Sequence, residues 1–518
     1  MKFICITAIF LMLLFPCNFI FPQEEPSPEF DWEPFENEAE FQQTQIDTAA
    51  DPDFDEDTEP DEEEEELQDD DEIPAEIKPP LPVPPPVPVN VRQMNILQYG
   101  TETEIAALIQ TLRNEKDPSL DDALMELAET SKNKTIISGI LVFFGEREKK
   151  GLEDRAMRVI RERDFEANET VLAAVDYLGR VNAAPAIDTL RELIISAEVR
   201  FLNNAIRAMG RAGRGDPEAG DKAAQFLLDQ FTNEIHTSDN QREIVVAIGE
   251  TGSSQGVVFL SNMVKNNDER PVLRMAALDA LGKIADPAGL DAVIEAVTAD
   301  DPNVRSSAIA ALGPFSGEAA DRAILEGFRD SYYRTRIGAA QAAGKRGMET
   351  AVPYLRFRAE NDEVAVVKDE AIKALGAIWN DEARIVLESL FFDRKIADRV
   401  RILAGEMLLL NDAPFYTGRA IAELDDSKTR NQTALYNGIL RILGPGVAVD
   451  LESLARRFLV SGTIVEKSYA LDMAVNNNFL SLEAEIRSCL DERRNGAGLA
   501  RKAQTTLEKL GLDLAITD

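Results

Sequence analysis

Apolar residues recur along most of the chain with the period of an amphipathic helix. After the turn at 300–303, Val304, Ala308, Ala311 and Leu312 fall at offsets 0, 4, 7 and 8, which place them on one stripe of a 3.6-residue helix. We therefore expect a short helix buried along that stripe. Variants of the same phrase, V-R-x-x-A-x-x-A-L-G, begin at Leu273, Thr335 and Val367.

A glycine closes each phrase and reveals a repeat. Successive glycines are 31 to 39 residues apart as far as Gly376, and the later gaps of 68 and 67 residues each hold two repeats. A fixed period near 32 residues with helical patterning is typical of a stacked helical array. The glycines are Gly145, Gly179, Gly210, Gly249, Gly282, Gly313, Gly344, Gly376, Gly444 and Gly511.

A second helix precedes each phrase, as at 290–297, 323–328 and 351–357. Pro353 fits only the first turn of the last of these. Residues 299–303 (Ala-Asp-Asp-Pro-Asn) supply a helix stop and aspartates that cap the next helix. Because no strand pattern of comparable length occurs, we predict an all-α fold, an α-α superhelix over residues 91–518 that is clearest over 145–444.

The phrase, its turn and its glycine resemble the short bacterial HEAT-like repeats of the phycobilisome (PBS)-lyase type. Residues 282–313 follow that family pattern nearly in full, and the resemblance extends from Gly145 to the C-terminus and more weakly from Val91. It implies a HEAT-like solenoid. Most members of the family are interaction scaffolds. A few are enzymes: bilin lyases, enzymes that remove alkylated DNA bases, and hydroxylases with a diiron site.

The enzymatic branches of that family find little support in the residues. A diiron site needs repeated His-Glu pairs, and His236 is the single histidine of the chain. No cysteine pair or Ser-His-Asp arrangement suggests a metal or a nucleophile. We therefore expect no catalytic residue, no metal and no cofactor. The alternative is an envelope enzyme or lyase-like protein with a small-molecule pocket between repeats.

Charge is distributed unevenly. The formal net charge is −38, but residues 24–76 hold 26 Asp and Glu and no Lys or Arg, and without them and Lys2 the remainder carries −13. Such acidic runs repel themselves and predict disorder. The proline-rich stretch 78–89 favours a stiff polyproline spacer. We expect residues 23–90 to be a disordered acidic and proline-rich tether, and a net-acidic array argues against nucleic acid as partner.

Residues 1–22 hold Lys2 and an apolar run that is typical of an export signal. Three interpretations remain open: a cleaved signal peptide, an uncleaved N-terminal anchor, or a lipoprotein cut before Cys17. We expect an exported protein of the bacterial periplasm or cell envelope, touching membrane only through this segment if it is uncleaved or lipidated. A cleaved chain keeps only Cys489, which we expect to be a buried apolar residue.

A basic residue follows the first position of five phrases. It suggests either an anion-binding ladder or a structural bond to a turn aspartate or to the adjacent repeat, and aspartates at 268, 300, 330 and 362 favour the structural interpretation. The ladder consists of Arg274, Arg305, Arg336, Lys368 and Arg401.

In this fold the phrase helix lines the concave side, and its offsets +2 and +6 stay exposed. These positions mix apolar residues with both signs of charge, which is more typical of a protein-binding surface than of a nucleic-acid groove. The candidate face comprises Arg207, Arg242, Met275, Asp279, Ile337, Gln341, Asp369, Lys373, Ile402 and Glu406.

The leading hypothesis is a non-enzymatic scaffold of the cell envelope that binds a protein or peptide on this concave face. A further alternative is a surface adhesin, because Arg214-Gly215-Asp216 lies in a predicted loop, 210–217, and resembles integrin-binding motifs.

Overall fold

The computed structural model describes residues 89–232 and 238–512 of the 518-residue chain. The segment 1–22, nearly all of the tether and His236 lie outside the described residues, so the expectations for them stay predictions. Within the described ranges every regular element is helical, and none of the helices combines the length and the apolar character that crossing a bilayer requires. The predicted all-α fold is therefore confirmed.

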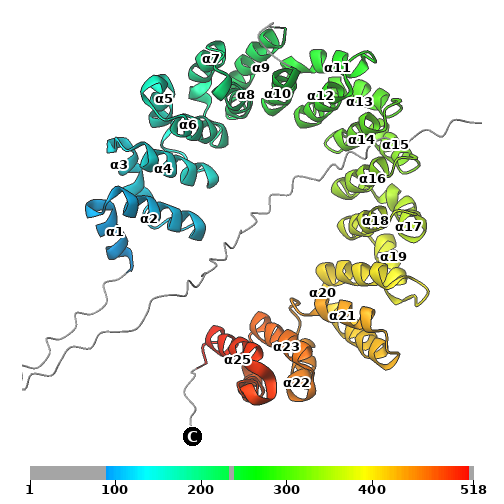
Figure 1. The fold of residues 1–518 in the computed structure, drawn as a ribbon. Helices are drawn as coiled ribbons and strands as arrows, with labels where there is room; N and C mark the ends of the chain where they lie inside the picture. Colours follow the sequence, from blue (N-terminus) through cyan, green and yellow to red (C-terminus); the bar gives the residue numbers. More distant parts are fainter. Residues whose placement is uncertain (1–88, 233–237, 513–518) are drawn as a thin grey trace, which may run out of the picture. The chain divides into compact units, whose positions relative to one another are not determined.

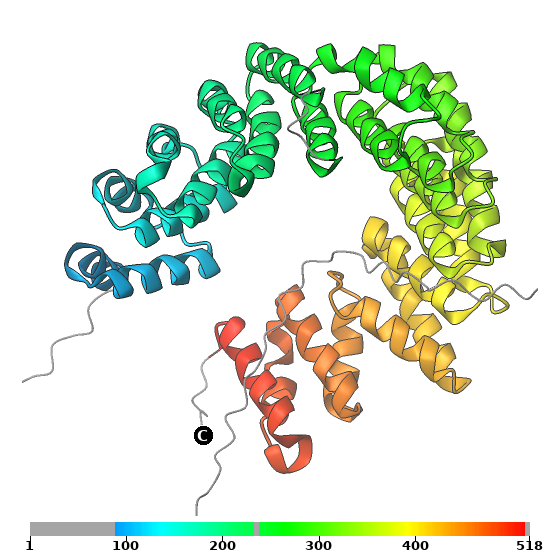
Figure 2. The same ribbon diagram turned by 45° about the horizontal axis from the view of Figure 1, so that its top comes forward.

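The helices form two rows, with the phrase helices on the inner side of the curve in Figure 1. Each inner helix packs against the next inner helix, and the rows stay distinct when the view is turned (Figure 2). The inner row consists of α2 (Glu102–Glu115), α4 (Lys134–Glu146), α6 (Asn168–Arg180), α8 (Val199–Gly213), α10 (Ser238–Glu250), α12 (Pro271–Ile284), α14 (Pro302–Ala311), α16 (Tyr333–Arg346), α18 (Ala365–Ile378), the first part of α20 (Asp398–Thr429), α21 (Thr433–Leu443), α23 (Ile464–Asn477) and α25 (Glu492–Lys509).

The outer row covers the other side of each inner helix. It consists of α1 (Val89–Tyr99), α3 (Asp121–Thr130), α5 (Glu153–Arg161), α7 (Ile187–Ile195), α9 (Pro217–Phe231), α11 (Val257–Lys265), α13 (Leu290–Ala296), α15 (Glu318–Gly327), α17 (Val352–Asn361), α19 (Asp381–Phe392), the second part of α20, α22 (Leu451–Ser461) and α24 (Glu483–Ser488). Short 3-10 segments occur at Arg163–Phe165, Ala184–Ala186, Ser254–Gly256, Pro287–Gly289, Glu349–Ala351 and Leu480–Leu482.

Helix α20 is two helices joined at a kink. Asp412 has φ −149° and ψ 69°, outside the helical region, and Pro414 follows it. The part before the kink is an inner helix and the part after it is the outer helix that precedes α21. The 68-residue gap between Gly376 and Gly444 therefore holds two repeats, as predicted.

Local sequence signals start the helices where they were expected. The side chain of Asp301 caps α14 by accepting a hydrogen bond of 2.7 Å from the backbone N–H of Asn303. Pro302 and Pro353 lie in the first turns of α14 and α17, where no backbone donor is needed. These predictions are confirmed.

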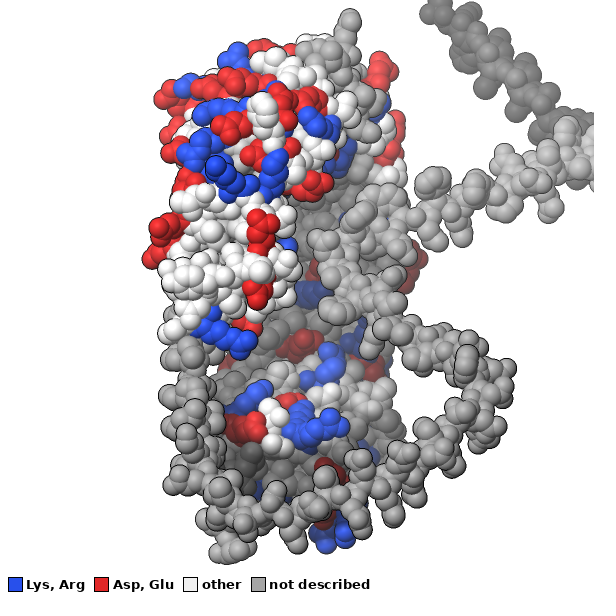
Figure 3. All heavy atoms as spheres, turned by 60° about the vertical axis from the view of Figure 1, so that its left-hand side comes forward, with Lys and Arg blue, Asp and Glu red and all other residues white. Residues whose placement is uncertain are grey.

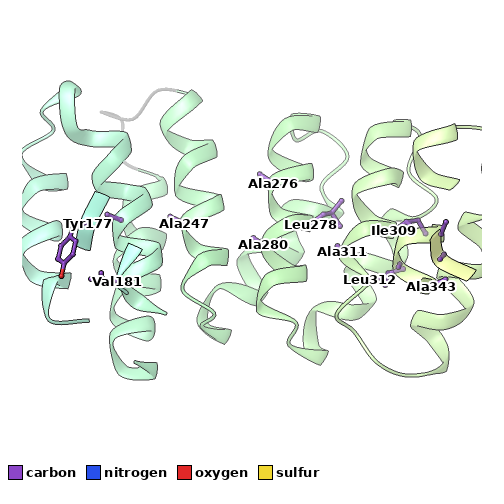
Figure 4. Packing of buried hydrophobic residues seen from close by; sticks show 14 of the residues in the cluster. Tyr177, Val181, Ala247, Ala276, Leu278, Ala280, Ile309, Ala311, Leu312 and Ala343 are labelled. Carbon is purple, nitrogen blue, oxygen red and sulfur yellow. The ribbon is translucent and has the colours of Figure 1, made fainter. Parts of the chain in front are cut away.

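The predicted apolar stripe is the core. Val304, Ala308 and Leu312 are fully buried and Ala311 is 5% exposed. Burying one leucine-sized side chain stabilises the fold by roughly 1.5–3 kcal/mol, and the stripe repeats on each neighbouring inner helix. Figure 4 shows Ala247, Ala280, Ala311 and Leu312 packed between consecutive inner helices.

The phrase glycines allow the inner helices to approach closely. A Cβ placed on five of these glycines would lie between 2.5 and 3.1 Å from the Cα of an alanine in the next repeat, closer than nearly all real Cβ contacts. Gly313 is an exception, because its nearest neighbour is the Ala310 carbonyl oxygen of its own turn, at 3.3 Å. We call the five contacts the Gly–Ala ladder: Gly179–Ala208, Gly210–Ala247, Gly249–Ala280, Gly282–Ala311 and Gly344–Ala374.

Candidate partner-binding surface

The ten residues of the predicted face all lie on inner-row helices, and each is exposed or half-buried. Six of them line two separate grooves. Arg207 and Arg242 both pair with the carboxylate of Glu243. The other two, Met275 and Ile337, are half-buried and line neither groove.

The first groove, the α18–α21 groove, lies where α18, the first part of α20 and α21 meet, and has a volume of about 410 Å³. Ile402, Leu403 and Ala434 give it an apolar floor. An apolar floor with a charged rim is typical of surfaces that bind a protein or peptide. The rim carries Asp369, Lys373, Asp398, Arg399, Glu406 and Arg441.

Packing and ion pairs fix the side chains of this groove. A Cβ on Gly438 of α21 would lie 2.1 Å from Cδ1 of Ile402, so the missing side chain at Gly438 leaves the space that Ile402 occupies. Arg399 forms an ion pair with Asp369 of α18, and Lys373 lies 2.8 Å from Glu370. Burial raises the pKa of Glu370, but hydrogen bonds from Lys373 and Gln341 outweigh it, so that pKa lies below its ordinary value. Glu370 is therefore charged at neutral pH and holds Lys373 in place on the rim.

The second groove, the α12–α16 groove, has a volume of about 550 Å³ and is lined by α12, α14 and α16. Small residues, including Gly282, Ala310 and Gly338, form its floor, so backbone is close to the surface. Asp279 and Gln341 of the predicted face line its rim together with Lys283 and Lys345.

Sequence reasoning missed part of the first groove. Arg399, Leu403 and Ala434 line it but occupy other offsets than +2 and +6. The groove forms at the repeat that lacks its glycine and that contains the α20 kink. The rule that offsets +2 and +6 are exposed comes from regular repeats, so it does not predict that these residues line a groove.

The basic ladder is occupied by bonds within the array. The guanidinium of Arg305 pairs with Asp330 at 2.7 and 3.1 Å, and that of Arg336 pairs with Asp362 at 2.8 Å through both Nε and Nη2. In both pairs the aspartate belongs to the turn of the following repeat. The remaining three residues donate to backbone carbonyls: Arg274 to Val264 (3.0 Å), Lys368 to Glu360 (3.1 Å) and Arg401 to Phe391 (3.0 Å).

Within the described part of the chain, no group of three or more His, Cys, Asp or Glu side chains is placed to hold a metal ion. The largest pKa shifts also occur away from both grooves. Burial raises the pKa of Tyr177 to about 12, and its hydroxyl donates to the Lys149 carbonyl at 3.0 Å. The Tyr177 hydroxyl thus links α6 to the segment between α4 and α5.

The predicted loop at 210–217 is shorter than expected, which corrects the sequence analysis. Helix α8 continues through Gly213, and α9 begins at Pro217. Gly213 packs against Ala223 and Gly220, where a Cβ would lie 3.1 and 3.2 Å away, so packing keeps these small residues helical. The side chain of Asp216 caps α9 by accepting from the Ala219 N–H at 3.0 Å, and so has a structural role.

Charge on the described surface is mixed. Figure 3 shows Lys and Arg interleaved with Asp and Glu over the face that it presents, without a large area of one sign. Several ion pairs of the described residues join neighbouring repeats, such as that of Arg113 of α2 with Glu146 of α4.

Comparison with known proteins agrees with the repeat pattern. A family model described as spirochaete HEAT repeat protein matches residues 97–506, which confirms the HEAT-like resemblance. Among curated proteins, deoxyhypusine hydroxylase of Kluyveromyces lactis is 23% identical over 212 residues, or 39% of this chain. The match covers 58% of that relative, less than two thirds of its length.

Solved structures with similar helical arrays include Kap121p, Kap95p and human deoxyhypusine hydroxylase. Kap121p has a TM-score of 0.39 at 12% identity, covering 81% of this chain and 53% of that one. Kap95p bound to RanGDP has a TM-score of 0.45 at 11% identity, covering 81% and 60%. Human deoxyhypusine hydroxylase has a TM-score of 0.23 at 20% identity, covering 61% and 98%. At such identities the likeness concerns the fold alone.

Proposed function

The chain belongs to the spirochaete HEAT repeat protein family, and from that premise we propose that it is a non-enzymatic scaffold that binds a protein or peptide in the α18–α21 groove. The observation that carries the proposal is the composition of this groove. Ile402 and Leu403 offer apolar area that a partner can cover, and Arg399 and Glu406 on the rim offer charges of both signs that fix its register.

Two features support a scaffold over an enzyme. A diiron hydroxylase needs several His-Glu pairs on facing helices, and this chain has one histidine, so the likeness to deoxyhypusine hydroxylase does not carry that activity over. The groove also lacks a nucleophile with an adjacent base among its lining residues.

The proposed location is the cell envelope. Its support is the apolar run at 1–22 followed by acidic and proline-rich sequence, which together suit export and a tether. In that setting the array binds its partner at a distance from the membrane or wall.

Site-specific photocrosslinking in the cells that make the protein tests the proposal. A photoreactive residue replaces Ala434, which is exposed and lines the groove, and the matched control replaces Ala422, which is exposed on the outer part of α20. We expect a discrete crosslinked protein from position 434, absent from position 422 and lost when Ile402→Glu is added. Identical products at both positions, or products unaffected by Ile402→Glu, would contradict the proposal.

A further inference from the structure

Five arginines gather on the inner surface of three consecutive helices. Arg180 lies on α6, Arg207 and Arg211 on α8, Arg214 directly after α8, and Arg242 on α10. We call them the arginine cluster. Their side chains are between 42% and 53% exposed, so each guanidinium is half in solvent.

Too few carboxylates reach this cluster to neutralise it. Asp176 is shared by Arg180 at 2.6 Å and Arg211 at 4.0 Å. Glu243 is shared by Arg207 at 2.5 Å and Arg242 at 3.1 Å. Glu250 pairs with Arg214 and with Lys283, and Lys283 also pairs with Asp279 at 2.8 Å, so four carboxylates serve six cations.

Most guanidinium donors in the cluster have no acceptor among the described residues. Arg180 and Arg207 each donate only through Nε, and Arg211 makes no hydrogen bond with the described part of the chain. A guanidinium has five N–H donors, and its two terminal nitrogens form the fork that grips a carboxylate. The cluster thus combines excess positive charge with unused, half-exposed donors.

We infer that the arginine cluster binds an acidic, extended stretch of the partner polypeptide. The inference rests on the proposed scaffold function and gives the chemical class of its partner. Packed helices lie roughly 8–10 Å apart, and an extended chain rises about 3.3 Å per residue, so every third residue of such a stretch meets a new inner helix. Acidic residues at that spacing pair with an arginine of α6, of α8 and of α10 in turn.

The partner is a polypeptide rather than a nucleic acid because the net charge of the remainder of the chain is −13. A polyanion of high charge density experiences that long-range repulsion along its whole length. A short peptide with carboxylates every third residue gains the local pairing at the cluster and presents far less charge to the rest of the array.

Fluorescence anisotropy with the full chain tests the inference. The probe is a labelled twelve-residue peptide with Glu at every third position, and its Gln analogue and a twelve-nucleotide single-stranded DNA are the comparison probes. We expect the Glu peptide to bind more tightly than either comparison probe. Its affinity should fall by about tenfold in Arg180→Gln/Arg211→Gln, since two charge-assisted contacts are lost.

The control variant is Arg322→Gln/Arg356→Gln, which removes the same charge from outer helices. Those side chains are 71% and 57% exposed and pair only within their own helices. We expect its affinity for the Glu peptide to stay within about twofold of wild type. An equal loss in the control, or equal binding of the Gln peptide or of the DNA, would overturn the inference.

The acidic run at 61–72 of this chain can compete with the probe in solution, so the measurement is repeated with its Asp and Glu changed to Asn and Gln. If the Glu peptide binds only after that change, the acidic run of this chain itself occupies the arginine cluster, and the inference is overturned. Absence of peptide binding in both forms would do the same. Crosslinking at Ala434 is a separate readout, so failure of the acidic peptide leaves the proposed function standing.

Discussion

Arg336 on α16 donates two hydrogen bonds of 2.8 Å to the carboxylate of Asp362, which belongs to the turn of the next repeat and has a fully buried side chain. Burial raises the pKa of Asp362, but the bonds from Arg336 and from the Val364 N–H outweigh it, so that pKa lies below its ordinary value. The Asp362 carboxylate is therefore charged at neutral pH, and the pair links two repeats through their buried side.

We predict that Asp362→Ala destabilises the repeats around α16–α18. Removing the carboxylate leaves the buried Arg336 charge without its counter-charge, with only the Asp330 and Ser331 carbonyls as acceptors, which costs about 3–5 kcal/mol. Hydrogen exchange resolved by segment should show faster exchange in α16 and α18. The control is Glu318→Ala, which breaks an exposed pair with Arg322 and should change stability by less than about 1 kcal/mol. Equal effects of the two changes would contradict the role assigned to the buried pair.

A second prediction concerns the Gly–Ala ladder. A Cβ on Gly249 would lie 2.5 Å from Cα of Ala280, so Gly249→Ala should force α10 and α12 apart at a cost of about 1–3 kcal/mol. Gly313→Ala reduces the conformational freedom of the unfolded chain by the same amount but causes no such clash. It should therefore be neutral or stabilising by less than about 1 kcal/mol. Thermal unfolding of the two variants checks the difference; equal melting temperatures would show that close approach is not why glycine stands at 249.

The regular part of the fold was predictable because its cause is local. A stripe such as Val304, Ala308 and Leu312 can be buried only by a neighbour with the same stripe, so period and pattern alone predict stacked helix pairs. The cap at Asp301 and the prolines of the first turns follow from backbone chemistry that involves a few adjacent residues.

The candidate surface was predictable only in part, because it depends on contacts between repeats. The offset rule placed Ile402 and Glu406 on the inner face, but it could not show that they share a groove with Ala434, which lies on the far side of the α20 kink. The sequence likewise offered Asp300 as a partner for Arg305, whereas the carboxylate that Arg305 binds is that of Asp330, 25 residues later.

A third prediction tests the core of the central repeats. Leu312 is fully buried in the apolar core, so Leu312→Asp removes a charge from water and should unfold the central array. The matched control is Leu410→Asp, because Leu410 is 72% exposed and should tolerate the charge. Circular dichroism on heating distinguishes them: a Leu312→Asp protein that melts like wild type would show that this helix is not packed as described.

Near the C-terminal end, a buried carboxylate joins three elements. Glu466 of α23 is 3% exposed and accepts hydrogen bonds from Lys428 Nζ at 2.7 Å, from the Thr463 N–H at 2.7 Å and from the Tyr436 hydroxyl. Burial raises the pKa of Glu466, but the bonds from Lys428, Tyr436 and Thr463 outweigh it and lower that pKa to about 2.

The final prediction is that the stability contributed by Glu466 is lost in acid. Because its folded-state pKa is below the ordinary value of 4.5, the contribution is complete above about pH 4.5 and disappears as the pH falls towards 2. Glu466→Gln keeps the shape of the side chain but not the charge, so it should be less stable than wild type by roughly 2–3 kcal/mol at pH 7. All other acidic groups are common to both proteins, so the difference between their urea unfolding curves isolates this residue. That difference should narrow steadily between pH 4.5 and pH 2, and a difference independent of pH would show that the charge of Glu466 does not stabilise the fold.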